Sequence, residues 1–313
     1  MSDHDKRNAV SAKSLHINRS PWYANLAIHI VFILFSLACL APLALLVIIS
    51  LTPENLILQN GYTFFTRELT LNAYEFLFSK PDLVINAYSV TFFIVIVGTF
   101  ISLFITILYA YPISRMDFPF RNFFSMFIVL TMLFNGGLTA TYLVNVRLLH
   151  LRNTVWALVL PLIGSAFYIL IARTFFRNTI PGELLESARI DGASEGRILF
   201  QIVLPLSLPM LATIGLFIVF RYWNDWFQAL LYLTDKKLYP LQFVMNRALM
   251  NVQYLQQNIS TLSSEEAMIE LAKMPSESLR MAMAVTSIGP IVIAYPFFQK
   301  YFISGLTVGA VKG

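Results

Sequence analysis

The chain alternates between long apolar runs and short polar connections. Six runs stay apolar for about 20 residues, the length that an α-helix needs to cross the hydrocarbon core of a bilayer. The composition agrees, because 57% of the 313 residues are hydrophobic and only 12% are charged, a balance typical of chains whose solvent is lipid. The pattern therefore predicts an all-α membrane protein with six transmembrane helices, at residues 26–51, 83–111, 123–144, 154–172, 205–220 and 283–301.

Glycine and proline fall inside the later runs and predict breaks in their helices. A broken membrane helix is tolerated where it packs on protein or lines a cavity, so these breaks favour a pathway through the membrane. Close packing of helices through small residues is the alternative, and we favour it at Gly164. The other breaks are predicted at Gly136–Gly137, Pro161, Gly289–Pro290 and Pro296.

The distribution of charge predicts how the chain is oriented. With the N-terminus inside, the inner side receives twelve of the 22 basic and seven of the 17 acidic residues, and so carries the whole net charge of +5. Because cytoplasmic loops are enriched in Lys and Arg, both ends are predicted to be cytoplasmic, and no nucleic-acid partner is needed to explain the basic balance. The predicted organisation is a cytoplasmic tail over 1–24, a transmembrane domain over 25–304 with a large outer loop at 224–280, and a cytoplasmic tail over 305–313.

Several kinds of chemistry are missing from the sequence. The interiors of the six runs lack Asp, Glu, Lys and Arg, groups that ion-coupled carriers usually keep at membrane depth. No Gly-Lys pair occurs, so a phosphate-binding P-loop is absent. Cys39 is the only cysteine and the four histidines are scattered, which excludes an internal disulfide and disfavours a metal site. The energy for any transport should therefore come from a partner.

A polar segment at 181–209 separates two of the apolar runs and predicts a bent helical hairpin. Pro181 suits the first turn of a short helix, and Gly192 supplies a left-handed residue to stop it. Ser194 is a plausible N-cap for a second helix that would return to the membrane. An ordinary cytoplasmic loop is the alternative interpretation of this segment.

The same segment contains Glu186-Ser187-Ala188, Asp191-Gly192-Ala193 and Leu204-Pro205. These motifs resemble the EAA loop of permease subunits of ATP-binding-cassette importers, which would extend over 177–209 here. In that family the first helix of the loop docks in a groove of the ATPase subunit and transmits its motion. The resemblance therefore implies the coupling residues Leu184, Leu185, Glu186, Ser187, Ala188, Asp191, Gly192 and Ala193, with Lys312 of the C-terminal tail at the ATPase interface. Ser187 stands where the family usually has alanine.

Other segments resemble the carbohydrate branch of this family, of maltose or oligosaccharide type. They are Phe134–Gly137, Asn153–Leu158, Trp223–Trp226, Tyr239–Gln242 and the last five residues, 309–313. Aromatic faces can stack on sugar rings and amide groups can bond sugar hydroxyls, although an interfacial aromatic belt is the alternative for Trp and Tyr. Candidate contacts with substrate are Asn135, Tyr142, Tyr168, Tyr222, Trp223, Asn224 and Trp226. Tyr168 departs from the asparagine expected in this branch.

The resemblance implies a type I ABC importer permease in the cytoplasmic (inner) membrane of a bacterium, importing an oligosaccharide or glycoside. It implies partners as well: a second, homologous permease, two ATPases and an extracytoplasmic solute-binding protein. The chain itself would be no enzyme and would hold no cofactor, since ATP and Mg would be bound by the partner ATPase. A permease for another small solute, such as a glycerol phosphate, and an ion-coupled secondary carrier remain as alternatives.

Overall fold

The computed structural model describes residues 21–79, 81–257 and 276–310, and every regular element among them is a helix. Most of the predicted 1–24 tail, Lys312 and part of the 224–280 loop therefore lie outside the described residues. The long helices are α2 (Trp22–Ser50), α5 (Pro81–Ser114), α6 (Arg121–Leu133), α9 (Ala166–Thr179), α13 (Leu208–Trp223), α15 (Leu241–Gln257) and α17 (Glu277–Ala310). The short ones are α3 (Glu54–Asn60), α4 (Asn72–Leu77), α7 (Gly137–Leu143), α8 (Trp156–Val159), α10 (Gly182–Ile190), α11 (Glu195–Ile198), α12 (Leu204–Leu206) and α14 (Phe227–Tyr232).

Five of the six predicted spans correspond to segments that are long and apolar enough to cross a membrane. The first two are the single helices α2 and α5, and the next three are bent pairs of helices. The bend is 113° between α6 and the segment that starts with α7, 52° between the segments of α8 and α9, and 80° between those of α11 and α13. The sixth predicted span lies within α17.

The predicted breaks are partly right. Gly137 and Gly164 both have positive φ, 78° and 73°, and each stands at the bend of its pair, so Gly164 serves a turn rather than close packing. The break expected at Gly289–Pro290 and Pro296 is wrong, because α17 continues through both prolines. A proline removes one backbone hydrogen bond, and membrane helices can continue where their surroundings satisfy the freed carbonyl.

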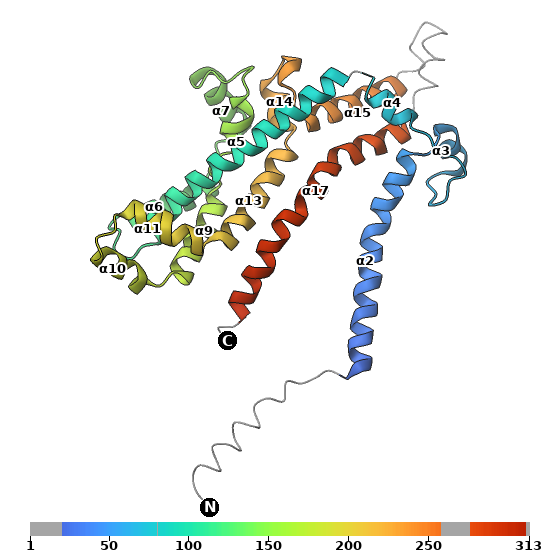
Figure 1. Cartoon of the computed structure of the whole chain (residues 1–313). Helices are drawn as coiled ribbons and strands as arrows, with labels where there is room; N and C mark the ends of the chain where they lie inside the picture. Colours follow the sequence, from blue (N-terminus) through green and yellow to red (C-terminus); the bar gives the residue numbers. More distant parts are fainter. Residues whose placement is uncertain (1–20, 80, 258–275, 311–313) are drawn as a thin grey trace, which may run out of the picture.

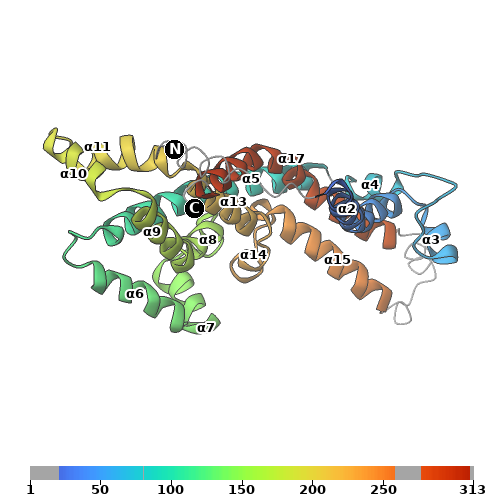
Figure 2. The same ribbon diagram turned by 90° about the horizontal axis from the view of Figure 1, so that it is seen from below.

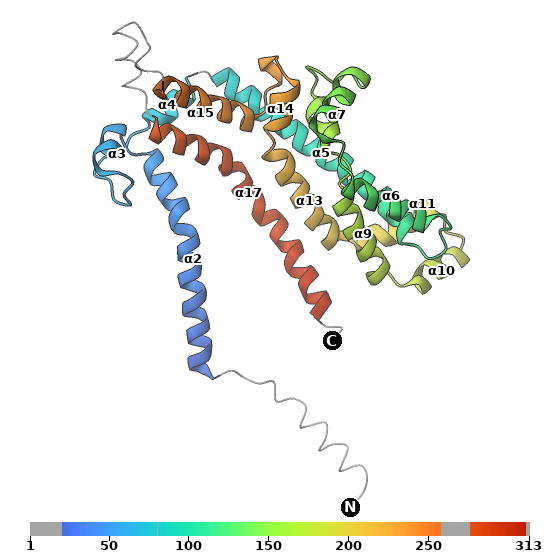
Figure 3. The same cartoon turned by 180° about the vertical axis from the view of Figure 1, so that it is seen from behind.

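Helix α5 is the centre of the arrangement, and α9, α13, α15 and α6 pack against it (Figure 1). Helix α17 packs against α13 on one side and α2 on the other. The start of α2, the end of α17 and helix α10 lie at one end of the molecule, whereas α3, α4, α14 and α15 lie at the other (Figures 1 and 3). This arrangement agrees with an orientation in which the start of α2, the end of α17 and the polar hairpin share one side of the membrane.

One tyrosine joins three elements at the centre of the core. Tyr222 of α13 is fully buried, and its hydroxyl donates to the carbonyl of Val159 at 3.0 Å and lies 3.2 Å from Ser102 Oγ. The ring occupies the space over Gly98, where the Cβ atom of any larger residue would stand only 2.5 Å from Tyr222 Cζ. Helices α5 and α13 can therefore approach at this height only because residue 98 has no side chain.

A carboxylate fixes the start of α17 at the other end of the molecule. Glu54 of α3 accepts hydrogen bonds from the backbone N–H groups of Glu277 at 2.9 Å and Ser278 at 3.0 Å. It also accepts from the hydroxyls of Ser276 and Ser278. Burial opposes the charged form, but these hydrogen bonds hold the pKa of the Glu54 carboxyl below its usual value. The negative charge at the start of α17 thus caps the helix from a distant element.

We expect Gly98→Ala to lower the thermal stability of the protein, because the new methyl group must push Tyr222 away. Overpacking of this kind costs about 1–3 kcal/mol. The matched control is Gly289→Ala in α17, where an added Cβ meets nothing within 4 Å. Thermal unfolding of the detergent-solubilised protein should separate the two variants, and equal melting temperatures would contradict the packing described here.

Candidate functional site

The polar hairpin predicted from the sequence is present as α10 followed by α11. Helix α10 begins at Gly182, so Pro181 occupies the N-cap, one residue before the predicted first turn. Glu183 lies in the first turn of α10 and Arg189 in its last turn. Both charges are favourable there, because the helix dipole is positive at its start and negative at its end.

The bend between the two helices is a Schellman motif centred on Gly192. Gly192 has φ 81°, the left-handed conformation that glycine adopts at low cost. The N–H of Ala193 donates to the carbonyl of Ala188 at 2.9 Å, and the N–H of Gly192 donates to that of Arg189 at 3.0 Å. This pair of hydrogen bonds ends α10 and turns the chain. Ser194 then caps α11, as predicted, by accepting a hydrogen bond from the Arg197 N–H at 3.4 Å.

Helix α10 has one face toward the protein and one toward solvent. Leu185 and Ala188 pack against the core, together with Ala193 beyond the bend. None of the nine residues of α10 is buried, however. The exposed side chains of α10 include Glu186 and Ser187 and two large apolar ones, Leu184 at 39% and Ile190 at 86% exposure. Apolar packing therefore attaches α10 only weakly, and its outer face is free to contact another molecule.

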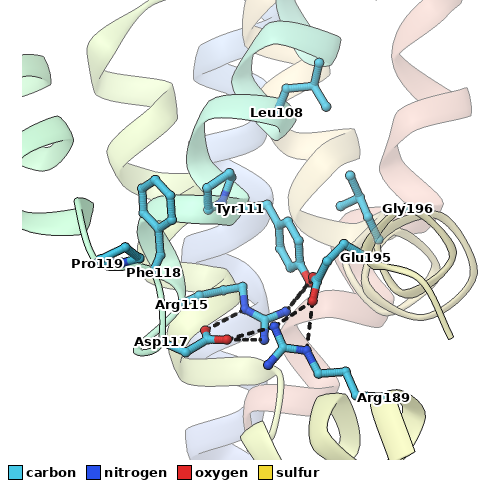
Figure 4. Close-up of a pocket in the computed structure, with 11 residues that line it drawn as sticks. Leu108, Tyr111, Arg115, Asp117, Phe118, Pro119, Arg189, Glu195 and Gly196 are labelled. Atoms are coloured by element: carbon cyan, nitrogen blue, oxygen red, sulfur yellow. Dashed lines mark hydrogen bonds and ion pairs between the residues drawn. The ribbon is translucent and has the colours of Figure 1, made fainter. Parts of the chain in front are cut away.

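Four charged side chains attach the hairpin to the end of α5 (Figure 4). They form a closed ring of alternating sign, in which Arg115 contacts Asp117 at 2.9 Å, Asp117 contacts Arg189 at 2.8 Å, Arg189 contacts Glu195 at 2.6 Å, and Glu195 contacts Arg115 at 2.9 Å. We call Arg115, Asp117, Arg189 and Glu195 the charge ring. The Tyr111 hydroxyl joins it, since it accepts from Arg115 at 2.7 Å and donates to Glu195 at 3.3 Å.

Arg115 and Asp117 stabilise each other as ions. Hydrogen bonds from Arg115 hold the pKa of the Asp117 carboxyl far below its usual range. Burial would lower the pKa of Arg115, but its hydrogen bonds to Asp117 and Tyr111 raise it above the usual value. Neither group titrates near neutral pH, so this pair stays charged over the physiological range.

The ring forms the polar edge of a largely apolar cavity of about 400 Å³. Leu108 and Pro112 of α5, Phe118 and Leu199 supply its apolar wall. On the other side of the ring, Leu185 and Glu186 line a second cavity of about 280 Å³ together with Phe176 and Arg177. The two cavities thus leave unfilled space beside the hairpin, which is not packed tightly against the neighbouring helices.

The predicted contacts with substrate are distributed over several places. Asn135 lies at the break between α6 and α7, where its Oδ1 accepts from the Gly137 N–H at 2.9 Å. Tyr142 stacks on Tyr232 of α14 with ring centroids 5.7 Å apart. Tyr168 of α9 stacks on Phe217 of α13 with centroids 6.4 Å apart. Each of these side chains already has a partner within the chain.

The other four candidates lie together at the end of α13 but differ in accessibility. Tyr222 has no exposed surface and Trp223 has 4%. The Trp223 indole N–H donates to the Ser287 carbonyl at 2.9 Å, and its ring contacts Phe92. In this conformation both side chains hold α13 against its neighbours and offer no face to a solute. Asn224 and Trp226 are more accessible, so they remain the candidates that a solute could reach.

Asn153 ties two outer loops together. It has φ 55°, a left-handed conformation that asparagine tolerates better than most residues. Its side chain donates to Thr234 Oγ1 at 2.7 Å and accepts from the Thr234 N–H at 2.6 Å. The segment Asn153–Leu158, which resembles the carbohydrate branch, therefore has a structural role at this position.

Sequence reasoning missed Asp225, which stands between the two tryptophans just beyond α13. Within the described residues its Oδ2 is buried without a hydrogen-bond partner, while Oδ1 accepts from the Gln228 N–H at 3.5 Å. Burial raises the pKa of this carboxyl to about 6. An acid between aromatic residues at the end of a membrane helix is a signal that could have drawn attention to it.

Comparison with known proteins identifies the family. A family model described as the inner membrane component of binding-protein-dependent transport systems matches residues 10–308. The chain belongs to this family. It is accordingly a multi-pass inner membrane protein with the type I importer permease fold, and a transport subunit rather than an enzyme.

Individual relatives match this chain over most of the length of both proteins. A polygalacturonan/rhamnogalacturonan transport system permease protein, YtcP of Bacillus subtilis (strain 168), is 36% identical over 90% of this chain and 95% of its own. An arabinooligosaccharides transport system permease protein, AraQ of Halalkalibacterium halodurans, is 30% identical over 87% and 91%. A crystal structure of a bacterial ABC transporter involved in the import of the acidic polysaccharide alginate contains a chain that superposes with a TM-score of 0.75 at 28% identity, covering 91% of this chain and 98% of that one.

We expect Asp225→Asn to stabilise the protein at pH 8. The wild-type carboxylate is ionised there and has one unpartnered oxygen, which destabilises the folded state by about 1–3 kcal/mol. The folded-state pKa of about 6 lies above the ordinary value of 3.8, so the wild type loses stability as pH rises from 3.8 through about 6. The gain in melting temperature should therefore shrink toward about pH 5. Asp235→Asn is the control, since Asp235 is exposed. A gain that does not depend on pH would contradict the assignment.

Proposed function

We propose that this chain is the membrane subunit that couples ATP hydrolysis by cytoplasmic partners to the import of an oligosaccharide. The observation that carries the proposal is the geometry of α10 and α11. An exposed, amphipathic helix that ends in a glycine bend lies at the same end of the molecule as the start of α2 and the end of α17 (Figure 1). Such a helix, fixed by hydrogen bonds at its bend and by charges at its base, suits a groove on a soluble partner.

The partners follow from the proposed role. A second, homologous permease would complete the pathway, two ATPase subunits would bind ATP and Mg, and a solute-binding protein would deliver the substrate. The exposure of α2 supports a further membrane contact, because only 6% of its most apolar stretch is buried. Its side chains therefore face lipid or another membrane subunit.

The proposed contact with the ATPase is the outer face of α10. Leu184 and Ile190 would enter the partner's groove, and Glu186, Ser187 and Asp191 would lie at its rim. Leu185, Ala188, Gly192 and Ala193 would hold the shape of the helix from behind. Ile190 is added to the residues expected from sequence because its 86% exposure leaves it accessible to a partner. Lys312 remains a proposal from the resemblance alone.

The substrate we infer is an oligosaccharide. Relatives named for polygalacturonan/rhamnogalacturonan and for arabinooligosaccharides support this class. Among the aromatic candidates, Trp226 is the one whose ring is both accessible and at the end of a membrane helix. It contacts Phe227 edge to face, which leaves much of one surface open to a sugar ring.

Gly192→Val should uncouple ATP hydrolysis from transport while the complex still assembles. A β-branched residue in the left-handed region costs about 1–2 kcal/mol, enough to open the bend and misplace α10. Gly192→Asn is the matched control, because asparagine accepts this conformation more readily. Transport and ATPase activity are measured on the complete complex in nanodiscs. If the valine variant transports like the wild type, α10 is not the coupling element.

Trp226→Ala and Trp223→Ala should have different effects. The first should reduce transport with normal assembly and normal basal ATPase activity, because it removes an accessible face without opening the core. The second should lower stability by about 3–5 kcal/mol, as expected for a buried tryptophan. Melting temperature and transport per assembled complex are measured together. A stability loss in both variants, with transport per complex unchanged, would assign Trp226 to the interfacial aromatic belt instead.

A further inference from the structure

The hairpin needs a rigid attachment if it is to transmit force, and its apolar contacts do not provide one. No residue of α10 is buried, and the space on either side of the ring is hollow. A partner that displaced α10 would therefore move it relative to the membrane helices unless some other contact held it. The charge ring is the strongest such contact among the described residues.

The ring has the right connectivity for this task. Arg115 and Asp117 follow directly after α5, whereas Arg189 and Glu195 stand on opposite sides of the Gly192 bend. The links between Arg115 and Glu195 and between Asp117 and Arg189 thus hold both arms of the hairpin to one short segment (Figure 4). The other two links lie within that segment and within the hairpin, and they keep the charges in place.

The side chain of Arg115 is more deeply buried than those of its acidic partners. Its side chain is 10% exposed, against 48% for Asp117 and 53% for Glu195. It binds both oxygens of Asp117 with two nitrogens, each at 2.9 Å, and uses Nη1 for Tyr111 and Glu195. A planar guanidinium can make this set of bonds and a lysine cannot.

We propose that Arg115 and Asp117 are positioning residues that lock the coupling hairpin to α5, so that movement of α10 passes through the charge ring into that helix. Helix α5 then carries the movement to α9 and α13, which pack against it. This inference rests on the proposed function of the hairpin and adds to it the place where its motion enters the membrane domain. Figure 2 shows that α10 projects beyond most of the other helices. A force on α10 therefore reaches those helices only through the contacts that attach it.

Charge reversal tests the links between the two elements. Asp117→Arg or Arg189→Asp alone leaves three like charges in the ring, and we expect the ATP consumed per sugar transported to rise about five-fold, as for a disrupted charge network. The double variant Asp117→Arg/Arg189→Asp exchanges the two charges, so the link between positions 117 and 189 is again one of opposite sign, while Arg115 keeps its link to Glu195. It should recover only part of the wild-type ratio, because the links between positions 115 and 117 and between positions 189 and 195 then join like charges. Arg121→Gln, which removes a cation at the start of α6 outside the ring, should leave the ratio unchanged.

A distance measurement separates positioning from a general loss of stability. Spin labels are placed on the complete complex at Gly182→Cys in α10, where an added Cβ meets nothing within 4 Å, and at Phe100→Cys in α5, with Cys39→Ser removing the native thiol. We expect a narrow distance distribution with the wild-type ring, a broad one in Asp117→Arg, and one of intermediate width in the double variant. A narrow distribution in all three would overturn the proposal.

The outcome also distinguishes this inference from the proposed function. If Gly192→Val uncouples the complex but the ring variants transport with the wild-type ATP ratio, the hairpin couples by another route and only the ring is rejected. If neither Gly192→Val nor the ring variants change the ratio, the proposed function of the hairpin is rejected with it.

Discussion

The close approach of α5 and α13 over Gly98 is the contact on which the rest of the structure depends. Tyr222 fills the space that a side chain at position 98 would need, and its hydroxyl satisfies the Val159 carbonyl beside the break before α9. A carbonyl left without a hydrogen bond would be costly in a membrane protein, because lipid offers no replacement for water. One buried phenol therefore both packs two helices and permits the third to bend.

The strength of the contacts declines from this centre toward the hairpin. Around Tyr222 the side chains are buried and held by both packing and hydrogen bonds. At the hairpin the packing is slight, and ionic contacts with partly exposed partners take over. Buried apolar contacts define one arrangement, whereas at the water boundary the hydrogen-bonded charges of the ring set the position of the hairpin. The membrane domain is therefore held by packing, and the polar hairpin is attached to it mainly by ionic contacts.

The local features of this chain can be predicted from its sequence. The six apolar runs, the stop at Gly192 and the cap at Ser194 each depend on neighbours within a few residues, so a single stretch of sequence contains the information. The break at Gly137 is predictable for the same reason. Pro290 and Pro296 show the limit of that reasoning, because α17 continues where the local pattern predicts a break.

The features that depend on distant residues cannot be predicted in this way. Tyr222 and Trp223 look from sequence like interfacial or substrate-facing aromatics, and only their positions against Gly98 and Ser287 reveal the roles they have in the core. Arg115 and Glu195 are 80 residues apart in sequence, and nothing near either one predicts the pairing. The coupling residues themselves are proposed through resemblance, which carries information on the whole fold that a local pattern lacks.

The charged residues of this chain lie at the ends of its predicted spans and beyond them. The interiors of the six predicted spans carry no Asp, Glu, Lys or Arg, so the membrane part of this chain has no ionic contacts to rearrange when it moves. The described ionic contacts instead gather at the two ends, in the ring beside α10 and at the Glu54 cap and the Arg280–Glu277 pair at the start of α17. Paired charges hold a defined register, whereas the middles of the helices are held by the fit of close-packed side chains. The chain thus fixes the ends of its helices by charge and their middles by packing and by the hydrogen bonds around Tyr222.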